Sequence, residues 1–355
     1  MRQEFLKRYE VNQKVRKIFF IVFCTIVCIF IFTACTNACE HSFGAYQADE
    51  SYHWREYSCE HTAPSNKDLH TDGDANGSCD ACGYEMKKSS IASKGLEYLL
   101  NDEGTKYAVN SIGSCTDKDI VIPDTNNGIP VVGILRGAFE GNTEITSVVL
   151  PDSVIIVYEN AFAECTALES ITLGNELKEI GESAFLGCES LASIALPSGL
   201  EYIYGHAFNG CVSLREIEIP DSVTLVQEYA FANCTALESI AFSNQMSTIK
   251  PNTCYGCSAL KEIRFGTSIT TVRKDAFYGC RDLEYLYIPK NITSINSAFA
   301  GCQSLLRMEF EETDNWKWAS PRGFFNSVNV NDPKKNAENM KGLYSGSSWL
   351  RETEV

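Results

Sequence analysis

The sequence has little histidine and a shortage of positive charge. Of its 355 residues, five are histidine, and 30 lysines and arginines stand against 46 aspartates and glutamates, a formal net charge of −16. A surface this acidic repels nucleic acid and anionic lipid. The composition therefore excludes both as main partners.

The signatures of common catalytic sites are also missing. Catalysis needs a nucleophile, a base and an orienting group, or a metal with an open coordination position. The repeat region contains a single histidine, His206, which we expect to be exposed, and the chain has no G-x-S-x-G, H-E-x-x-H or phosphate-binding glycine-rich loop. The many carboxylates lie mostly between apolar positions, a pattern typical of a solvated face. We predict that the protein is not an enzyme.

What the chain has instead is a repeat of 23 residues, seen clearly in residues 161–183, AFAECTALESITLGNELKEIGES. Self-similarity at a fixed period of this size indicates a solenoid. Every step between equivalent positions is 23 residues except the last, which is 22. The phenylalanine of the unit recurs at Phe139, Phe162, Phe185, Phe208, Phe231, Phe277 and Phe299, and Cys254 takes its place in one coil.

Each repeat contains a Leu-x-x-Ile-x-Leu segment that alternates like a strand. In Leu168–Leu173, period two places Ile171 and Leu173 on one face and Ser170 and Thr172 on the other. A proline or glycine commonly ends this strand. A short second extended piece follows, and the Ala-Phe-x-x-Cys segment closes the coil as a turn or a single helical turn. The expected fold is a mainly β solenoid.

The two ends of the array are atypical, as terminal repeats must be to cover an open core. Residues 96–100 and 105–110 predict a β-hairpin, and residues 120–134 predict a degenerate first coil with an insertion at 124–128. After Phe310 the pattern breaks, and Asp332-Pro333 is a typical start for a short helix. We expect an N-terminal cap with the first coil at 93–136, repeats at 137–310 and a C-terminal cap at 311–355.

A cysteine follows the phenylalanine in nearly every coil. Equivalent positions in stacked coils lie about 5 Å apart, so distance alone permits disulfides. The side chains should nevertheless point in parallel toward the core, and their number is odd, so we expect buried free thiols that act as small apolar groups. The seven are Cys165, Cys188, Cys211, Cys234, Cys257, Cys280 and Cys302.

The motif G/N-A-F-x-x-C-x-x-L-x-x-I-x-I/L-P resembles the BspA-type, or treponemal-type, leucine-rich repeat of bacterial and protist surface proteins. The resemblance covers residues 95–355, with Asn142 in place of the first cysteine and Cys254 in place of one phenylalanine. It implies a leucine-rich-repeat solenoid and an extracellular binding or adhesion protein.

The N-terminus predicts export. Residues 2–17 are basic, residues 18–32 are apolar apart from Thr25, and residues 32–35 (FTAC) resemble the lipobox of bacterial lipoproteins. This reading makes residues 1–34 a signal peptide and Cys35 the lipidated first residue of a protein anchored at the cell surface. The alternative is an uncleaved membrane anchor. Both place residues 36–355 outside the cytoplasm.

Residues 35–92 form a small module rich in cysteine and histidine. A closing C-x-x-C with clustered thiols and imidazoles is what a tetrahedral zinc site needs. Two alternatives stay open: a calcium loop opened by Asp72 and Asp74, which lacks the final glutamate, and a disulfide, Cys39 with Cys59 or Cys79 with Cys82. The candidate metal ligands are Cys59, His61, His70, Cys79 and Cys82.

The outward residues of successive strands should line up into one continuous surface. We predict a partner site centred on Tyr285, Tyr287 and Arg264, with Glu216 and Glu218 toward its rim, because tyrosine and arginine often anchor interfaces. The alternative is a soluble strand face that binds nothing. The function is therefore either adhesion, through a protein or glycoprotein ligand, or organisation of the cell envelope by a lipoprotein without a soluble ligand.

Overall fold

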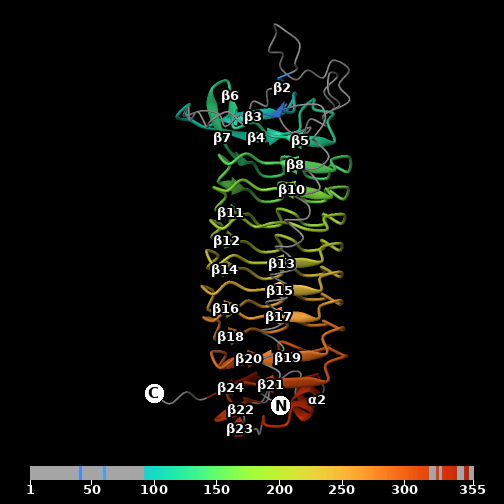
Figure 1. Cartoon of the computed structure of the whole chain (residues 1–355). Coiled ribbons are helices and arrows are strands. Elements are labelled where there is room, and N and C mark those ends of the chain that lie inside the picture. Colours follow the sequence, from blue (N-terminus) through green and yellow to red (C-terminus); the bar gives the residue numbers. More distant parts are fainter. Residues whose placement is uncertain are drawn as a thin grey trace. The chain divides into compact units, whose positions relative to one another are not determined.

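The computed structural model describes residues 40–41, 59–60, 92–319, 325–327, 330–341 and 348–351. The chain divides into two compact units, Met1–Ser89 and Ser90–Val355. In the first unit, β1 (Glu40–His41) pairs antiparallel with β2 (Cys59–Glu60). The second unit is a stack of coils, each contributing short strands to two ladders that run along the stack (Figure 1).

The first ladder consists of the strands that the Leu-x-x-Ile-x-Leu segments predict. In order along the stack these are β5 (Asp119–Val121), β8 (Ser147–Val149), β10 (Ser170–Thr172), β13 (Glu216–Glu218), β15 (Ser239–Ala241), β17 (Glu262–Arg264), β19 (Tyr285–Ile288) and β21 (Arg307–Phe310). Their pairing is parallel, and Ser170 lies opposite Ser147, so each coil is offset from the last by one repeat. The ladder divides into three sheets, β10-β8-β5, β13-β15-β17 and β19-β21.

The second ladder is the short extended piece of each coil. It is made of β7 (Ile129–Ile134), β9 (Ile156–Val157), β11 (Glu179–Ile180), β12 (Tyr202–Ile203), β14 (Leu225–Val226), β16 (Thr248–Ile249), β18 (Thr271–Val272) and β20 (Ser294–Asn296). These strands are parallel to one another as well. The predicted mainly β leucine-rich-repeat solenoid is confirmed.

One predicted strand does not form. Residues 191–197 follow the path of the other coils, and Leu191 and Ile194 are buried, yet no ladder pairing is present there. Residues 193–195 are Ser-Ile-Ala, the same three residues that form β15 at 239–241, so their identity does not account for the gap between β10 and β13.

The core is a column of phenylalanine rings with one interruption. Phe139, Phe162, Phe185, Phe208 and Phe231 stack with nearly parallel rings, their centroids 5.0 to 5.4 Å apart. Cys254 breaks the column before Phe277. The rings of Phe242 and Phe265 lie edge-on to Phe277, with centroid distances of 6.1 and 6.3 Å. Phe277 still stacks on Phe299 at 5.1 Å, and the larger side chains of two neighbouring strand ends pack near it where Cys254 supplies no ring.

The cysteines are free and buried, as expected, and they also make hydrogen bonds. Cys165 Sγ donates to the carbonyl oxygen of Phe139 at 3.1 Å, and Cys188 repeats this with Phe162 at 3.1 Å. The same contact recurs at Cys211, Cys234, Cys257, Cys280 and Cys302. Each thiol therefore links its coil to the preceding one.

The turn around each phenylalanine contains two residues in the left-handed region. The first lies two positions before the phenylalanine position: Gly137, Asn160, Ser183, His206, Tyr229, Asn252, Asp275 and Ser297, with φ between 48° and 64°. The second lies two positions after it: Gly141, Glu164, Gly187, Gly210, Asn233, Gly256, Gly279 and Gly301, with φ between 57° and 79°. Glycine, which adopts this conformation at little cost, fills six of the eight second positions, whereas the first position has one glycine and two asparagines.

Both ends of the array are covered. At the start, β3 (Glu97–Leu100) and β4 (Tyr107–Ser111) form the predicted hairpin, and β6 (Thr125–Asn126) pairs with β7 inside the predicted insertion. At the other end lie β22 (Trp316–Ala319), β23 (Phe325–Ser327), α2 (Pro333–Lys341) and β24 (Ser348–Arg351).

The C-terminal cap uses antiparallel pairing to end the second ladder. Strand β24 pairs with β20 on one side and β22 on the other. The carboxylate of Asp332 accepts hydrogen bonds from the backbone nitrogens of Lys334 and Lys335 at 3.1 and 3.2 Å, so it caps α2 as predicted. Trp316 and Trp349 are buried against Phe310.

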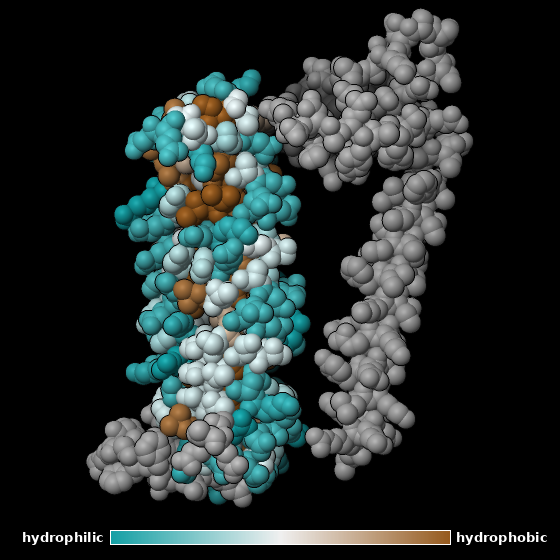
Figure 2. Space-filling view, turned by 90° about the vertical axis from the view of Figure 1, so that its left-hand side faces the viewer, coloured by the Kyte–Doolittle hydropathy of each residue, from teal (hydrophilic) through white to brown (hydrophobic). Residues whose placement is uncertain are grey.

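On the side of the solenoid that carries the second ladder, hydrophobic side chains gather near the N-terminal cap, and teal and white side chains with isolated brown ones follow (Figure 2). Its exposed apolar residues include Leu99, Leu100, Ile155 and Tyr158. Within the described ranges, no helix is long and apolar enough to cross a bilayer.

Candidate functional site

The outward side of the first ladder from β13 to β21 is the candidate site, and we call it the strand face. Along these strands, exposed side chains alternate with buried ones, as in Glu216-Ile217-Glu218 and Tyr285-Leu286-Tyr287. Inward residues such as Ile217 and Leu286 belong to the core, so the outward residues are positioned by a rigid support.

The C-terminal end of the strand face is aromatic and apolar. Tyr285 and Tyr287 on β19 are 46% and 44% exposed, and Leu306, which directly precedes β21, is 61% exposed. Glu284 and Leu306 are joined by a backbone hydrogen bond of 2.9 Å, which holds Leu306 beside the strand that carries both tyrosines. All three are large exposed side chains at one end of the strand face, and exposed tyrosines of this kind often anchor protein interfaces.

A carboxylate fixes the first of these tyrosines. Tyr285 Oη donates a hydrogen bond of 3.1 Å to Glu309 Oε2, and Arg307 forms an ion pair with the same carboxylate. Partial burial, and then the hydrogen bond to Glu309, raise the pKa of Tyr285 to about 12. The phenol therefore stays protonated and able to donate near neutral pH.

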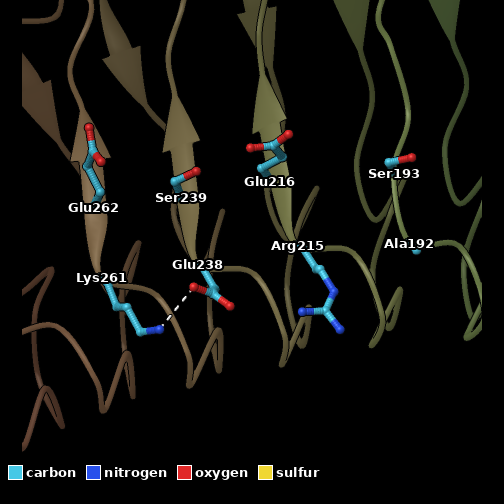
Figure 3. Close-up of a pocket in the computed structure, with 8 residues that line it drawn as sticks. All are labelled: Ala192, Ser193, Arg215, Glu216, Glu238, Ser239, Lys261 and Glu262. Atoms are coloured by element: carbon cyan, nitrogen blue, oxygen red, sulfur yellow. Dashed lines mark hydrogen bonds and ion pairs between the residues drawn. The ribbon is translucent and has the colours of Figure 1, made fainter. Parts of the chain in front are cut away.

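A groove of about 540 Å³ extends from the coil before β13 along the strand face to β17. It extends over four successive coils, with charged and small side chains along it (Figure 3). The lining residues are Ala192, Ser193, Arg215, Glu216, Glu238, Ser239, Lys261 and Glu262.

Some of the charges on this surface are paired and some are not. Lys261 Nζ lies 2.9 Å from Glu238 Oε2, and this hydrogen bond, followed by the charge of Lys261, lowers the pKa of Glu238. Arg264 Nε lies 3.6 Å from Glu262 Oε1. Within the described part of the chain, Arg215 and Glu216 take part in no ion pair.

The structure places all five residues of the predicted partner site on the strand face. Tyr285, Tyr287 and Arg264 lie on adjacent strands, β19 and β17, whereas Glu216 and Glu218 lie on β13, separated from Arg264 by β15. Whether these residues bind a partner stays a prediction.

Sequence reasoning missed the residues that directly precede the strands. Arg215, Glu238, Lys261 and Leu306 each follow the leucine that opens a strand segment, and each contributes to the groove or to the aromatic end. Their non-repeating identities at one fixed position of the unit are the signal that could have found them. His206 also differs from expectation: it is half-buried, stacks on Tyr229 at 4.8 Å and lies 3.0 Å from the Asn209 amide nitrogen.

The predicted metal site lies almost entirely outside the described residues. Of its five ligands only Cys59 falls within them, in β2, where its backbone lies opposite His41. His61, His70, Cys79 and Cys82 lie outside, as does Cys35. In the described ranges there is no group of three or more His, Cys, Asp or Glu residues arranged to hold a metal ion. Zinc, calcium and a disulfide therefore stay alternatives for this module.

A capped stack of parallel coils with an ordered, solvent-facing strand surface defines the class of leucine-rich-repeat scaffold proteins. Within that class the chain belongs to the family described as the BspA type leucine rich repeat region, which matches it in six copies over residues 110–238 and 226–332. No curated protein matches the chain.

The chain is similar to solved structures of bacterial leucine-rich-repeat proteins. The leucine rich repeat protein of T. pallidum is 30% identical, with a TM-score of 0.50 over 55% of this chain and 91% of that one. A leucine-rich repeat protein from Bacteroides ovatus is 25% identical, with a TM-score of 0.47 over 64% of this chain and 72% of that one. A leucine rich cell surface protein from Faecalibacterium prausnitzii is 23% identical, with a TM-score of 0.48 over 70% of this chain and 62% of that one.

Proposed function

We propose that this chain is a non-catalytic binding protein of the cell surface, and that its strand face holds a protein or glycoprotein ligand. The observation that carries the proposal is the exposure of Tyr285 and Tyr287, which β19 presents to solvent, together with the exposed Leu306 directly before β21. Several large exposed side chains close to one another typically mark an interaction site.

The physics of the strand face favours a macromolecular ligand over a small one. Repeat arrays present extended surfaces, and the strand face crosses five strands from β13 to β21. The aromatic end would supply buried contact area, and the charged groove would set orientation and specificity. Adhesion to a protein or glycoprotein on another cell or matrix is the role that fits such a surface.

The site is proposed to act outside the cytoplasm, carried by an N-terminal lipid anchor on Cys35. Support comes from the basic, then apolar, then small-residue pattern of residues 2–35, which is typical of a lipoprotein signal. In a repeat array the core residues recur while the surface residues vary from coil to coil, so recognition can be assigned to the varying residues without a catalytic group.

The test is capture of partners on immobilised chain from two sources, host matrix proteins and envelope material of the producing cell. Tyr285→Ala combined with Tyr287→Ala should lower the amount captured at least ten-fold, because truncating interface aromatics commonly costs this much or more. Circular dichroism should show an unchanged fold, since both side chains point outward.

The chain offers a matched control. Tyr255 and Tyr278 are 36% and 39% exposed and stack on each other at 4.8 Å, on the turns rather than on the strand face. Replacing both by alanine should leave capture unchanged. Equal losses in the two double variants would contradict the proposal, and capture from envelope material alone would favour the envelope-organising role.

A further inference from the structure

The groove on the strand face has two walls that differ in charge. Each coil contributes two consecutive residues to the groove, such as Arg215 and Glu216, and their side chains point in different directions (Figure 3). The lining therefore consists of two rows of side chains. One wall is Ser193, Glu216, Ser239 and Glu262, and the other is Ala192, Arg215, Glu238 and Lys261. Only the second wall contains cations, and one of them, Lys261, is already paired with Glu238.

The first wall alternates small and acidic side chains with a period of two coils. Glu216 is on β13 and Glu262 is on β17, and Ser239 of β15 lies between them in register with both. Adjacent strands of a sheet lie about 4.8 Å apart, so these two glutamates are separated by about 9.6 Å along the stack. The small residue between them leaves a hollow between two carboxylates.

Both carboxylates are available to a cationic ligand. Glu216 has no ion-pair partner in the part of the chain that the structure describes. Glu262 contacts Arg264 at 3.6 Å, but both side chains are exposed, and a single exposed pair of this kind contributes little and is easily exchanged. The strongly acidic chain also attracts cationic partners at a distance.

We propose that the groove binds an extended segment of a partner protein that bears lysine or arginine at every third residue and runs along the solenoid axis. This inference rests on the proposed function, because it assigns the partner's chemistry at the same strand face. In a polyproline II segment, residues three apart lie on one side about 9.3 Å from each other, which matches the separation of Glu216 and Glu262. In a β-strand, residues on one side repeat every 6.6 to 6.8 Å or so, which does not match.

Arg215 on the opposite wall complements such a segment. Its guanidinium makes no ion pair among the described residues. A guanidinium has several N–H donors and no acceptor, so it can only donate hydrogen bonds. A polyproline II segment has no internal hydrogen bonds, so its carbonyl oxygens are free to accept them. The groove therefore offers carboxylates to the cationic side chains and a donor to the backbone between them.

The experiment compares two labelled peptides of equal composition by fluorescence anisotropy with the purified full chain. One repeats Lys-Pro-Pro, which places lysines three residues apart, and the other holds the same residues with lysines two apart. We expect the three-residue spacing to bind at least five-fold more tightly, and its affinity to fall as salt is raised. Equal affinity of the two peptides would overturn the proposal.

A charge-matched pair of variants tests the site itself. Glu216→Gln with Glu262→Gln should weaken binding of the Lys-Pro-Pro peptide about ten-fold, since each exposed ion pair contributes about two- to five-fold. Glu176→Gln with Glu189→Gln, which removes two exposed glutamates outside the groove, should change affinity less than two-fold. Equal effects would show attraction to net charge alone and would refute the site. Failure here, with capture still dependent on Tyr285 and Tyr287, would leave the proposed function standing.

Discussion

At the scale of single residues, the buried thiol makes a hydrogen bond that a methyl group could not make. Cys165 donates its hydrogen to the Phe139 carbonyl oxygen of the preceding coil, at 3.1 Å, inside a core from which water is excluded. The same oxygen also accepts a hydrogen bond from the Asn142 backbone nitrogen at 3.1 Å, so the thiol supplies a second donor, this one from the next coil. The repeated cysteine is thus a small apolar group and a hydrogen-bond donor between coils.

Because these thiols are buried, the folded protein should become less stable as the pH rises into the alkaline range. Burial raises the pKa of Cys165 and Cys211 from an ordinary value near 9 to about 12. An acid whose pKa is raised on folding contributes stability fully below the unfolded value and loses it as pH rises through the folded value. The free energy of unfolding should therefore fall between pH 9 and pH 12, by about 1.4 kcal/mol per pH unit for each thiol.

The measurement is urea unfolding from pH 8 to pH 11 on the chain and on Cys165→Ala with Cys211→Ala. The variant should be less stable at pH 8 and should lose stability less steeply above pH 9. Ile203→Val, which shortens a buried side chain without removing a titrating group, is the control and should keep the original slope. The same slope in all three would show that these thiols do not titrate as argued.

At the scale of the coil, the repeat could be predicted from the sequence and its turn conformation could not. Apolar spacing predicts which residues face the core and where the strands lie, except at residues 191–197, where no strand forms. The left-handed turn residues are harder to see, because Glu164 and Tyr229 adopt φ of 58° and 59° at positions where other coils have glycine or asparagine. Backbone hydrogen bonds between coils hold them there, such as Glu164 nitrogen to the Leu186 carbonyl at 2.6 Å.

The site was predicted in part, for a related reason. Tyr285, Tyr287 and Arg264 follow from strand alternation, which identifies the outward positions. Arg215, Lys261 and Leu306 precede the strands, where alternation no longer assigns a side, so their position on the strand face needed the structure.

Replacing Cys254 by the phenylalanine that the other coils have at this position should destabilise the protein. Cys254→Phe inserts a ring where Phe242 and Phe265 already lie against Phe277, and overpacking of this kind typically costs about 1–3 kcal/mol. Adding Phe242→Leu should recover much of that loss, although Phe242→Leu alone destabilises by leaving space.

Chemical unfolding of the two single variants and the double variant forms a double-mutant cycle. A favourable coupling of about 1 kcal/mol or more is expected if the rings share one space. Additive effects would show that the larger side chains at 242 and 254 are independent. Phe310→Leu, at the equivalent strand position several coils away, should not couple to Cys254→Phe.

At the scale of the whole molecule, the N-terminal pattern predicts how the solenoid is held at a surface. Mass spectrometry of the protein isolated from its own cell should find a mature N-terminus at a diacylated Cys35. Cys35→Ser should yield chain without lipid that no longer partitions into detergent. Retention of residues 1–34 in the native protein would contradict the lipoprotein and favour an uncleaved anchor.

The one-repeat offset between paired strands, as in Ser170 opposite Ser147, also bears on how such a chain can change over generations. Duplicating or deleting one regular 23-residue unit keeps the core pattern, because the new neighbours present the same phenylalanine, cysteine and leucine. A unit added between β17 and β19 would move the tyrosines away from the groove by about 4.8 Å. Recombination within the gene can thus change the distance between the groove and the tyrosines in fixed steps. A chain altered in this way could bind different partners although neither element has a substitution.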